Sequence, residues 1–218
     1  MWCVPKLNEE FKERMEDVLD CYEKPFNLKE PVIGVDETSK QLLKDKRLGS
    51  GCKKGKVARR DYEYKRNGTR NLFVMVQVHA PKRKVKVTHR RKKSDFAEFL
   101  KEISEEEFPK AKRIHLIMDN LNTHFESSLT ERFGKREGKK IWNRFVPHYT
   151  PKHASWLNVA ENEIGILSRQ CLKRRIGDGR TMNAQVKAWT KKRNEKKIIT
   201  TWKFSTKEAK EKFPDLYN

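Results

Sequence analysis

The stretch Val32-Ile33-Gly34-Val35-Asp36 is a continuous apolar run that ends in an acid. A second run, Ile114-His115-Leu116-Ile117-Met118, ends in the same way at Asp119. Uninterrupted apolar runs of this length are typical of strands that are buried on both faces of a sheet. In open α/β sheets, ligands bind at the carboxyl ends of the strands. The two runs therefore predict an α/β fold with an acid at the carboxyl end of each of two neighbouring strands.

The rest of the chain alternates between strand and helix patterns. We expect a strand pair over 62–65 and 71–78, joined by a turn at Asn67-Gly68-Thr69, because Asn-Gly between strand-like runs is a strong hairpin signal. Residues 44–60 are basic and contain glycine, which indicates a mobile loop. Strands are also expected over 84–88 and near 144–146, and helices over 8–22, 94–107, 125–133, 157–173, 182–195 and 205–213. This order favours a mixed sheet with helices on both faces.

Charge is distributed unevenly along the 218 residues. The formal net charge is +21, and residues 1–31 contain eight acids and five bases, net −3, which leaves +24 for residues 32–218. A basic excess of this size favours a polyanionic partner through counterion release, so nucleic acid is the expected substrate. The alternative interpretation is a merely solvated, soluble surface.

Membrane insertion and zinc binding are not expected from the sequence. No apolar stretch approaches the roughly 20 residues needed to span a bilayer, and the N-terminus has no apolar signal segment. Cys3, Cys21, Cys52 and Cys171 are far apart and form no CxxC pair, so neither a zinc site nor a disulfide framework is predicted. Reduced thiols and a cytoplasmic location are the expectation.

A third acid completes a possible metal site. Glu161 lies just inside the helix expected from 157, and it competes with Glu163 for this role. Two residues apart on a helix, these side chains point about 200° apart, so only one of them can face the strand ends. Glu37 should face the opposite side of its strand from Asp36 and is expected to be a bystander. Asp119, taken alone, could equally be a turn or cap residue.

Carboxylates in this arrangement can hold a pair of Mg²⁺ or Mn²⁺ ions. Mg²⁺ prefers carboxylate and water oxygens. Two such ions, roughly 3.5–4 Å apart, activate a nucleophile and stabilise the leaving oxygen of a phosphodiester. The predicted catalytic and metal-binding residues are Asp36, Asp119 and, as the third acid, Glu161 or its competitor Glu163.

Three motifs carry a resemblance that covers nearly the whole chain. Val35-Asp36-Glu37-Thr38-Ser39-Lys40, the segment Met118 to His124, and the segment His148 to Leu172 resemble the catalytic domain of DDE transposases, most closely the insertion-sequence family IS six-thirty, which is related to mariner elements. The run from Tyr149 to Glu161 is long and specific. The resemblance implies an RNase H-like five-stranded fold, two Mg²⁺ or Mn²⁺ ions, cut-and-paste DNA movement, and Glu161 rather than Glu163 as third ligand.

The resemblance also sets expectations for domain organisation. A helical lead-in is expected over 1–31, the RNase H-like DDE domain over 32–198, and a C-terminal arm with a short helix over 199–218. The 41 residues between Asp119 and Glu161 exceed the spacing in many mariner relatives, and an insertion around 134–140 would accommodate them. Members of the family begin with helix-turn-helix modules, which we do not expect here. The expectation is thus a catalytic domain alone, from a truncated copy, the second frame of a split gene or an excised domain.

Other residues are expected to assist. Those expected to support the carboxylates, if they are not simply turn or helix-start residues, are Asn120, Asn122, His124 and Asn158. Basic residues expected to contact DNA phosphates, if they are not merely solvated, are Lys53, Lys54, Lys56, Arg59, Arg60, Lys82, Arg83, Arg90, Arg91, Lys152, Lys173 and Arg174.

The predicted function is transposition of double-stranded DNA. Water would attack the phosphate at a transposon end, and the freed 3′-hydroxyl would then attack target DNA. A homodimer in the nucleoid of a bacterial or archaeal cytoplasm is the expected setting. The alternatives are a structure-selective nuclease of the same fold, which cuts without joining, and a catalytically inactive remnant that only binds DNA.

Overall fold

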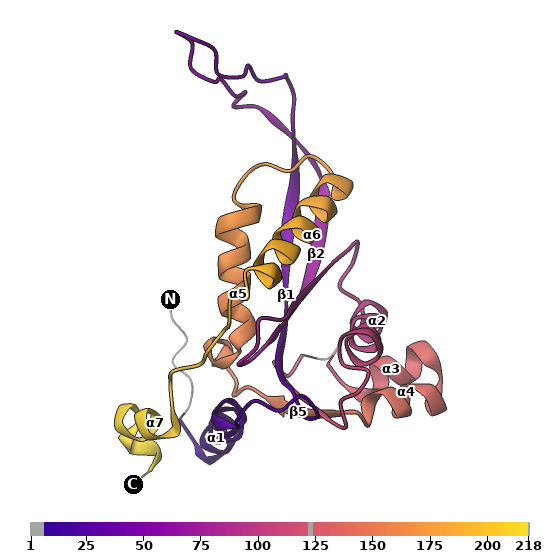
Figure 1. Ribbon diagram of the computed structural model, residues 1–218, viewed down its shortest axis with the longest axis vertical. Coiled ribbons are helices and arrows are strands. Elements are labelled where there is room, and N and C mark those ends of the chain that lie inside the picture. The colour runs from indigo at the N-terminus through magenta and orange to yellow at the C-terminus, as the bar shows by residue number, and fades with distance from the viewer. Residues whose placement is uncertain (1–6, 122–123, 218) are drawn as a thin grey trace.

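Five strands form one mixed sheet in the order β3-β2-β1-β4-β5 in the computed structural model, which describes residues 7–121 and 124–217. The central strand β1 (Val32–Asp45) pairs antiparallel with β2 (Tyr64–Gln77) and parallel with β4 (Ile114–Met118). The edges are β3 (Arg83–Thr88), antiparallel to β2, and β5 (Phe145–Tyr149), parallel to β4 (Figure 1). The predicted mixed five-stranded α/β fold is confirmed.

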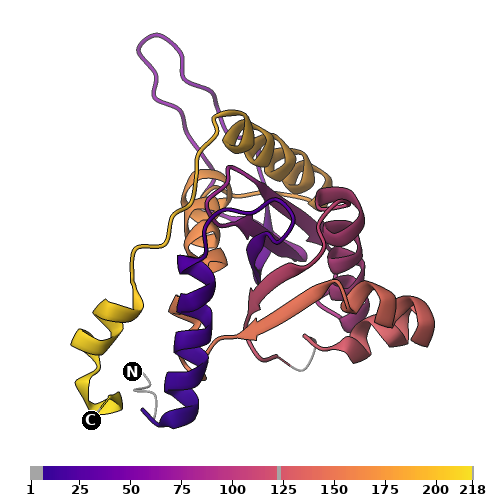
Figure 2. The same cartoon turned by 60° about the horizontal axis from the view of Figure 1, so that its bottom comes forward.

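Helices cover both faces of this sheet (Figures 1 and 2). One face carries α2 (Lys93–Glu102) with its continuation Ile103–Glu107, α3 (Glu126–Phe133) and α4 (Lys135–Trp142). The other face carries α1 (Glu9–Glu23), α5 (Val159–Leu167) with its continuation Ser168–Leu172, and α6 (Gly179–Glu195). The C-terminal α7 (Thr206–Lys212) packs beside α1, and single turns occur at Ser155–Leu157 and Pro214–Leu216. Residues 134–140, expected as an inserted stretch, belong largely to α4.

Alternation along β1 assigns its side chains to the two layers. Ile33 and Val35 are fully buried in the cluster that includes Phe96 and Phe99 of α2. Val32 belongs instead to the cluster formed with α1. Because side chains alternate along a strand, Asp36 lies on the α1 and α5 side of the sheet, together with Val32.

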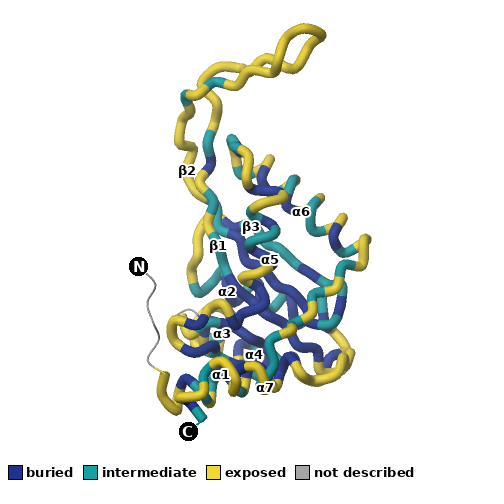
Figure 3. The backbone as a smooth tube through the Cα atoms, turned by 90° about the vertical axis from the view of Figure 1, so that its left-hand side faces the viewer, coloured by how far each residue is buried: buried dark blue, intermediate teal, exposed yellow. Residues whose placement is uncertain are grey.

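The β1–β2 pair is longer than the sequence suggested. It extends to Asp45 opposite Tyr64 and continues into an exposed arm, residues 46–63, which projects from one end of the molecule (Figures 1 and 3). The turn predicted at Asn67-Gly68-Thr69 is wrong, because these residues lie within β2. The register shifts opposite them, between Gln41 and Leu43, and Gly68 has a φ of 83°. The Asn-Gly pair therefore forms a β-bulge, where the left-handed backbone favours glycine.

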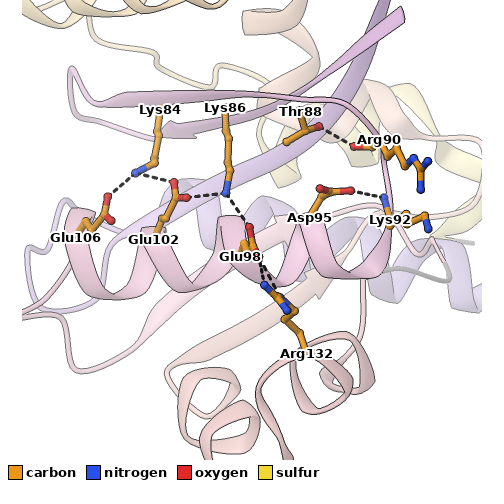
Figure 4. A network of polar contacts seen from close by, with 10 residues as sticks. All are labelled: Lys84, Lys86, Thr88, Arg90, Lys92, Asp95, Glu98, Glu102, Glu106 and Arg132. Carbon is orange, nitrogen blue, oxygen red and sulfur yellow. Dashed lines mark hydrogen bonds and ion pairs between the residues drawn. The ribbon is translucent and has the colours of Figure 1, made fainter.

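Ion pairs attach α2 to the edge strand β3 (Figure 4). Lys84 Nζ lies 3.2 Å from Glu102 and 2.9 Å from Glu106, and Lys86 Nζ lies 2.6 Å from Glu102. Arg132 of α3 contacts Glu98 of α2 at 2.6 Å. The basic face of β3 is thus balanced by acids of its own domain.

Within the described residues, none of the helices combines the length and the apolar character needed to cross a bilayer.

Candidate active site

The register of the parallel strands brings the two aspartates to the same edge of the sheet. Val32 pairs with His115 and Gly34 pairs with Ile117. The same offset, continued by two residues, sets Asp36 of β1 opposite Asp119, the residue after β4. Both acids therefore stand at the carboxyl ends of neighbouring strands.

Gly34 allows the start of α5 to approach β1 closely. A Cβ atom at this position would lie 2.4 Å from Val159 Cγ1 and 2.9 Å from Asn158 Oδ1. Such distances are shorter than real carbon contacts, and one of them involves the N-cap residue of α5. Glycine is required here because the strand and the helix N-terminus touch.

Asn158 and Tyr22 hold the first turn of α5 in place. Asn158 Oδ1 accepts from Ala160 N at 3.1 Å, and its Nδ2 donates to Val35 O at 2.9 Å. The Tyr22 hydroxyl of α1 donates to Leu157 O at 2.7 Å and accepts from Val159 N at 2.9 Å. Asn158 is fully buried, so the turn that carries Glu161 is tied both to β1 and to α1.

Glu161 and Glu163 have opposite surroundings. Glu161 is exposed in the first turn of α5. Glu163 is 1% exposed, and it accepts from Arg83 Nε at 2.7 Å and from Arg193 Nε at 2.7 Å and Nη2 at 3.1 Å. Because two arginines occupy its carboxylate, Glu163 is committed to a buried ion network, and Glu161 is the acid that is free to face the aspartates.

The carboxylates at this edge affect one another's ionisation. The pKa of Asp36 is raised to about 7, first by burial and then by repulsion from the carboxylates of Glu161, Asp119 and Glu37. The Glu37 N–H, which donates to Asp36 Oδ1 at 2.7 Å, opposes this rise. Of the two aspartates, Asp36 is thus the one whose ionised form is disfavoured in the absence of a cation.

His124 links Asp119 with Glu37. Its Nδ1 lies 2.7 Å from Asp119 Oδ1 and its Nε2 lies 3.4 Å from Glu37 Oε1, and the ring is buried against Phe96. Burial lowers the pKa of His124, but pairing with the two carboxylates outweighs this effect and raises the pKa to about 10. The imidazole is therefore a cation at neutral pH.

Glu37 is a site residue that the sequence analysis set aside. Its side chain faces away from Asp36, as strand alternation requires, yet it is not a bystander because it contacts His124. Only the later appearance of a histidine, five residues after Asp119, hinted that a second acid was needed.

The two asparagines that follow Asp119 were also expected to support the carboxylates. Asn120 is exposed and makes no polar contact with another described residue. Asn122 lies outside the described residues.

The donor set suits hard divalent cations. Asp36, Asp119 and Glu161 offer only carboxylate oxygens, the ligands that Mg²⁺ and Mn²⁺ prefer. Among the described residues, the buried Oδ1 of Asp119 has His124 Nδ1 at 2.7 Å but no hydrogen bond of good geometry. The charges of Glu161, Asp119 and Glu37 also contribute to the raised pKa of Asp36, after burial.

One of the expected DNA contacts is wrong. Arg83 cannot reach phosphate, because it is 2% exposed and paired with Glu163. Lys82 lies 3.1 Å from Glu107 Oε2 and 4.4 Å from the centre of the Phe108 ring, but its side chain is partly exposed and it stays a predicted contact. The remaining predicted contacts are exposed: Lys53, Lys54, Lys56, Arg59 and Arg60 on the arm, Arg90 and Arg91 after β3, and Lys152, Lys173 and Arg174 beside α5.

Known structures share this fold. The chain is similar to the Mos1 mariner paired end complex with Mn (TM-score 0.54, 16% identity, 88% of this chain and 58% of that chain). It is also similar to the Mos1 strand transfer complex (0.55, 14%, 88% and 57%) and to a pre-cleavage Mos1 transpososome (0.53, 15%, 90% and 64%). The chain thus spans less than two thirds of each of these proteins. No curated protein gives a significant match.

The sequence itself identifies the family. Residues 31–183, from the start of β1 into α6, match the DDE superfamily endonuclease model. This range contains all three acids at the sheet edge, as well as Asn158 and His124. The chain belongs to the DDE superfamily endonucleases.

Proposed function

We propose that this chain is the catalytic domain of a DNA transposase of the insertion-sequence type. Asp36, Asp119 and Glu161 would hold two Mg²⁺ or Mn²⁺ ions against double-stranded DNA. The observation that supports the proposal is that Asp36 and Asp119 stand at the ends of neighbouring parallel strands, where the charges of Glu161 and Asp119 add to burial in raising the pKa of Asp36. The family match and the shared fold of mariner transposase complexes support it.

The reaction would have two steps. Water hydrolyses the phosphodiester at a transposon end, and the freed 3′-hydroxyl then attacks a phosphate of target DNA. A bound pair of divalent ions would supply water activation and stabilisation of the leaving oxygen.

The chain's own residues prepare the site for this chemistry. Asp36, whose pKa is raised to about 7 mainly by burial, would hold the cations in its ionised form, which they would favour. His124 Nδ1, 2.7 Å from Asp119 Oδ1, orients that carboxylate. Asn158 fixes the turn that carries Glu161, whose side chain is exposed.

Finer properties follow from the same proposal. The chain would belong to the insertion-sequence family IS six-thirty, act as a homodimer and work on DNA in a prokaryotic nucleoid. Exposed basic residues of the arm would contact phosphates and position the duplex without reading its sequence.

A strand-transfer assay tests the proposal. Labelled transposon ends, both intact and already cut, are incubated with target DNA and Mg²⁺ or Mn²⁺. We expect joined products, and their loss in Glu161→Gln but not in Glu211→Gln, an exposed glutamate beyond α6. Cut but unjoined ends would indicate a nuclease instead, and binding without any cleavage would indicate an inactive remnant.

A further inference from the structure

Three potential metal ligands from three elements meet on the face of the sheet that α1 covers. Cys21 comes from α1, His115 from β4 and His148 from β5. One ligand atom from each lies within 4.8 Å of the other two. His115 Nδ1 is 2.9 Å from His148 Nε2, and Cys21 and His148 are buried. This cluster has no part in the proposed transposition chemistry.

Asp17 orients one of these ligands. Its Oδ2 lies 2.8 Å from His148 Nδ1. A carboxylate that accepts the Nδ1 proton leaves Nε2 with its lone pair directed into the cluster. Metal-binding histidines are typically held by such a carboxylate. His148 is therefore prepared to act as a ligand through Nε2.

At neutral pH, the protonation state of His115 favours metal binding, whereas Cys21 must lose a proton to bind. Burial, followed by the charges of Lys24 and His148, lowers the pKa of His115 to about 4, so its imidazole is neutral. Burial raises the pKa of Cys21 to about 12, although Lys24 Nζ, 3.9 Å from Sγ, opposes this shift. The other charges that act on the two groups are weaker and come from Asp17, Asp20 and Glu30.

We propose that Cys21 Sγ, His115 Nδ1 and His148 Nε2 bind a single Zn²⁺-type transition-metal ion. A mixed thiolate and imidazole set selects Zn²⁺ or Co²⁺ over the hard Mg²⁺ ion. Three protein ligands leave one tetrahedral position for solvent. No zinc site was predicted from the cysteine spacing, which contains no CxxC pair. The ligands of the proposed site lie instead on one helix and two strands that are far apart in the sequence.

Binding requires small, balanced changes. The S–H bond of Cys21 breaks, its proton goes to buffer and an S–metal bond forms. His115 moves its proton from Nδ1 to Nε2 without a net change. Two nitrogens on one tetrahedral ion, each at about 2.0–2.1 Å, stand roughly 3.3 Å apart, close to the 2.9 Å observed here.

This site would be separate from the catalytic carboxylates. His115 lies at the start of β4 and Asp119 follows its end, four residues later, which is about 13 Å along a strand. The ion would attach α1 to β4 and β5. Its expected role is structural, because α1 also supplies Tyr22 to the first turn of α5.

Cobalt substitution provides the first test. The full chain is titrated with Co²⁺ in excess Mg²⁺, which occupies the carboxylate site. We expect a thiolate-to-cobalt charge-transfer band in the near ultraviolet with about one equivalent of Co²⁺. The band should vanish in Cys21→Ser and persist in two controls, Cys171→Ser, which changes another buried cysteine, and Asp119→Asn, which changes the catalytic edge. A band that survives Cys21→Ser would overturn the proposal.

Thermal stability and proton release provide the second test. Zn²⁺ at 100 times its dissociation constant should raise the melting temperature of the wild type by roughly 5–10 °C and release about one proton. Without metal, Cys21→Ser should melt at about the same temperature as the wild type, which would show that the variant folds. Its melting temperature should rise less than that of the wild type when Zn²⁺ is added. His148→Asn provides an independent variant. If Zn²⁺ raises the melting temperatures of all three proteins equally, or does not raise that of the wild type, the cluster is only a hydrogen-bonded histidine pair and the proposal is wrong.

Discussion

The Asn158 side chain donates a hydrogen bond of 2.9 Å to the carbonyl of Val35, the residue before Asp36. The same side chain caps α5, three residues before Glu161. One buried amide thus connects the strand of the first acid to the helix of the third. The relative position of the two carboxylates depends on this contact.

Substitution of Asn158 by alanine should reduce both stability and activity. The variant loses a helix cap and leaves the Val35 carbonyl unsatisfied, which costs about 2–3 kcal/mol in the free energy of unfolding. Urea denaturation measures this cost. The matched control is Asn8→Ala, which removes the exposed cap of α1, whose Oδ1 accepts from Phe11 N, and should cost about 1 kcal/mol without reducing strand transfer. Equal activity in the two variants would show that Asn158 is only a cap.

The two neighbouring glutamates of α5 should respond oppositely to substitution. Glu163→Gln leaves Arg83 and Arg193 buried without a counter-charge, so we expect a loss of about 3–5 kcal/mol in the free energy of unfolding. Glu161→Gln removes a charge that repels Asp36, so stability should be unchanged or higher while strand transfer is lost. Urea denaturation and the joining assay separate the two outcomes. A stable, inactive Glu163→Gln would reverse the assignment.

Sequence patterns were sufficient to predict the central strands and the acids at their ends, but not the pairing between strands. The apolar runs that end at Asp36 and Asp119 predicted β1 and β4, because burial on both faces leaves a continuous signal. The bulge at Gly68 was predicted as a turn, because Asn-Gly favours a turn and a bulge equally. The pairing of β1 with β2 on both sides of Gly68 shows that it is a bulge.

Side-chain partnerships were harder to foresee. Arg83 sits in a basic run that resembles a phosphate contact, and its burial depends on Glu163 and on Arg193, 110 positions later. Glu37 was set aside because its strand face was considered without the histidine that packs over it. Such pairs join elements that are distant in sequence, so local periodicity carries no signal for them.

The carboxylate edge should make stability depend on pH in the absence of divalent ions. The pKa of Asp36 is about 7 in the folded protein, above its ordinary value of 3.8, so its contribution is fully present below about pH 4 and is lost as pH rises through about 7. The free energy of unfolding should fall over this window by up to about 1.4 kcal/mol per pH unit relative to Asp36→Asn. Urea denaturation of both proteins at about pH 5 and about pH 8 measures the difference.

Divalent ions should remove this pH dependence. Bound Mg²⁺ or Mn²⁺ favours the ionised Asp36 and stabilises the folded state by mass action. The melting temperature of the wild type should therefore rise with millimolar Mg²⁺ at about pH 8, and that of Asp36→Asn should rise less. A wild-type melting temperature that does not respond to either ion would count against an assembled site.

The exposed arm should dominate the salt dependence of DNA binding. Five of its seven basic residues were predicted to contact phosphate, and all five are exposed: Lys53, Lys54, Lys56, Arg59 and Arg60. The arm projects away from the helical layers (Figure 3). Each phosphate contact contributes about −0.9 to the slope of log K against log salt concentration, so replacing all five by glutamine should reduce the magnitude of that slope by up to about 4–5. Fluorescence anisotropy with duplexes of two unrelated sequences measures the slope. Binding of both duplexes should weaken equally, because phosphate contacts do not read bases.

A control with the same change in net charge replaces Lys110, Lys135, Lys139, Lys207 and Lys210, which are exposed but lie outside the arm. If this control lowers the slope as much as the arm variant, the effect comes from net charge, and the arm is not the DNA contact.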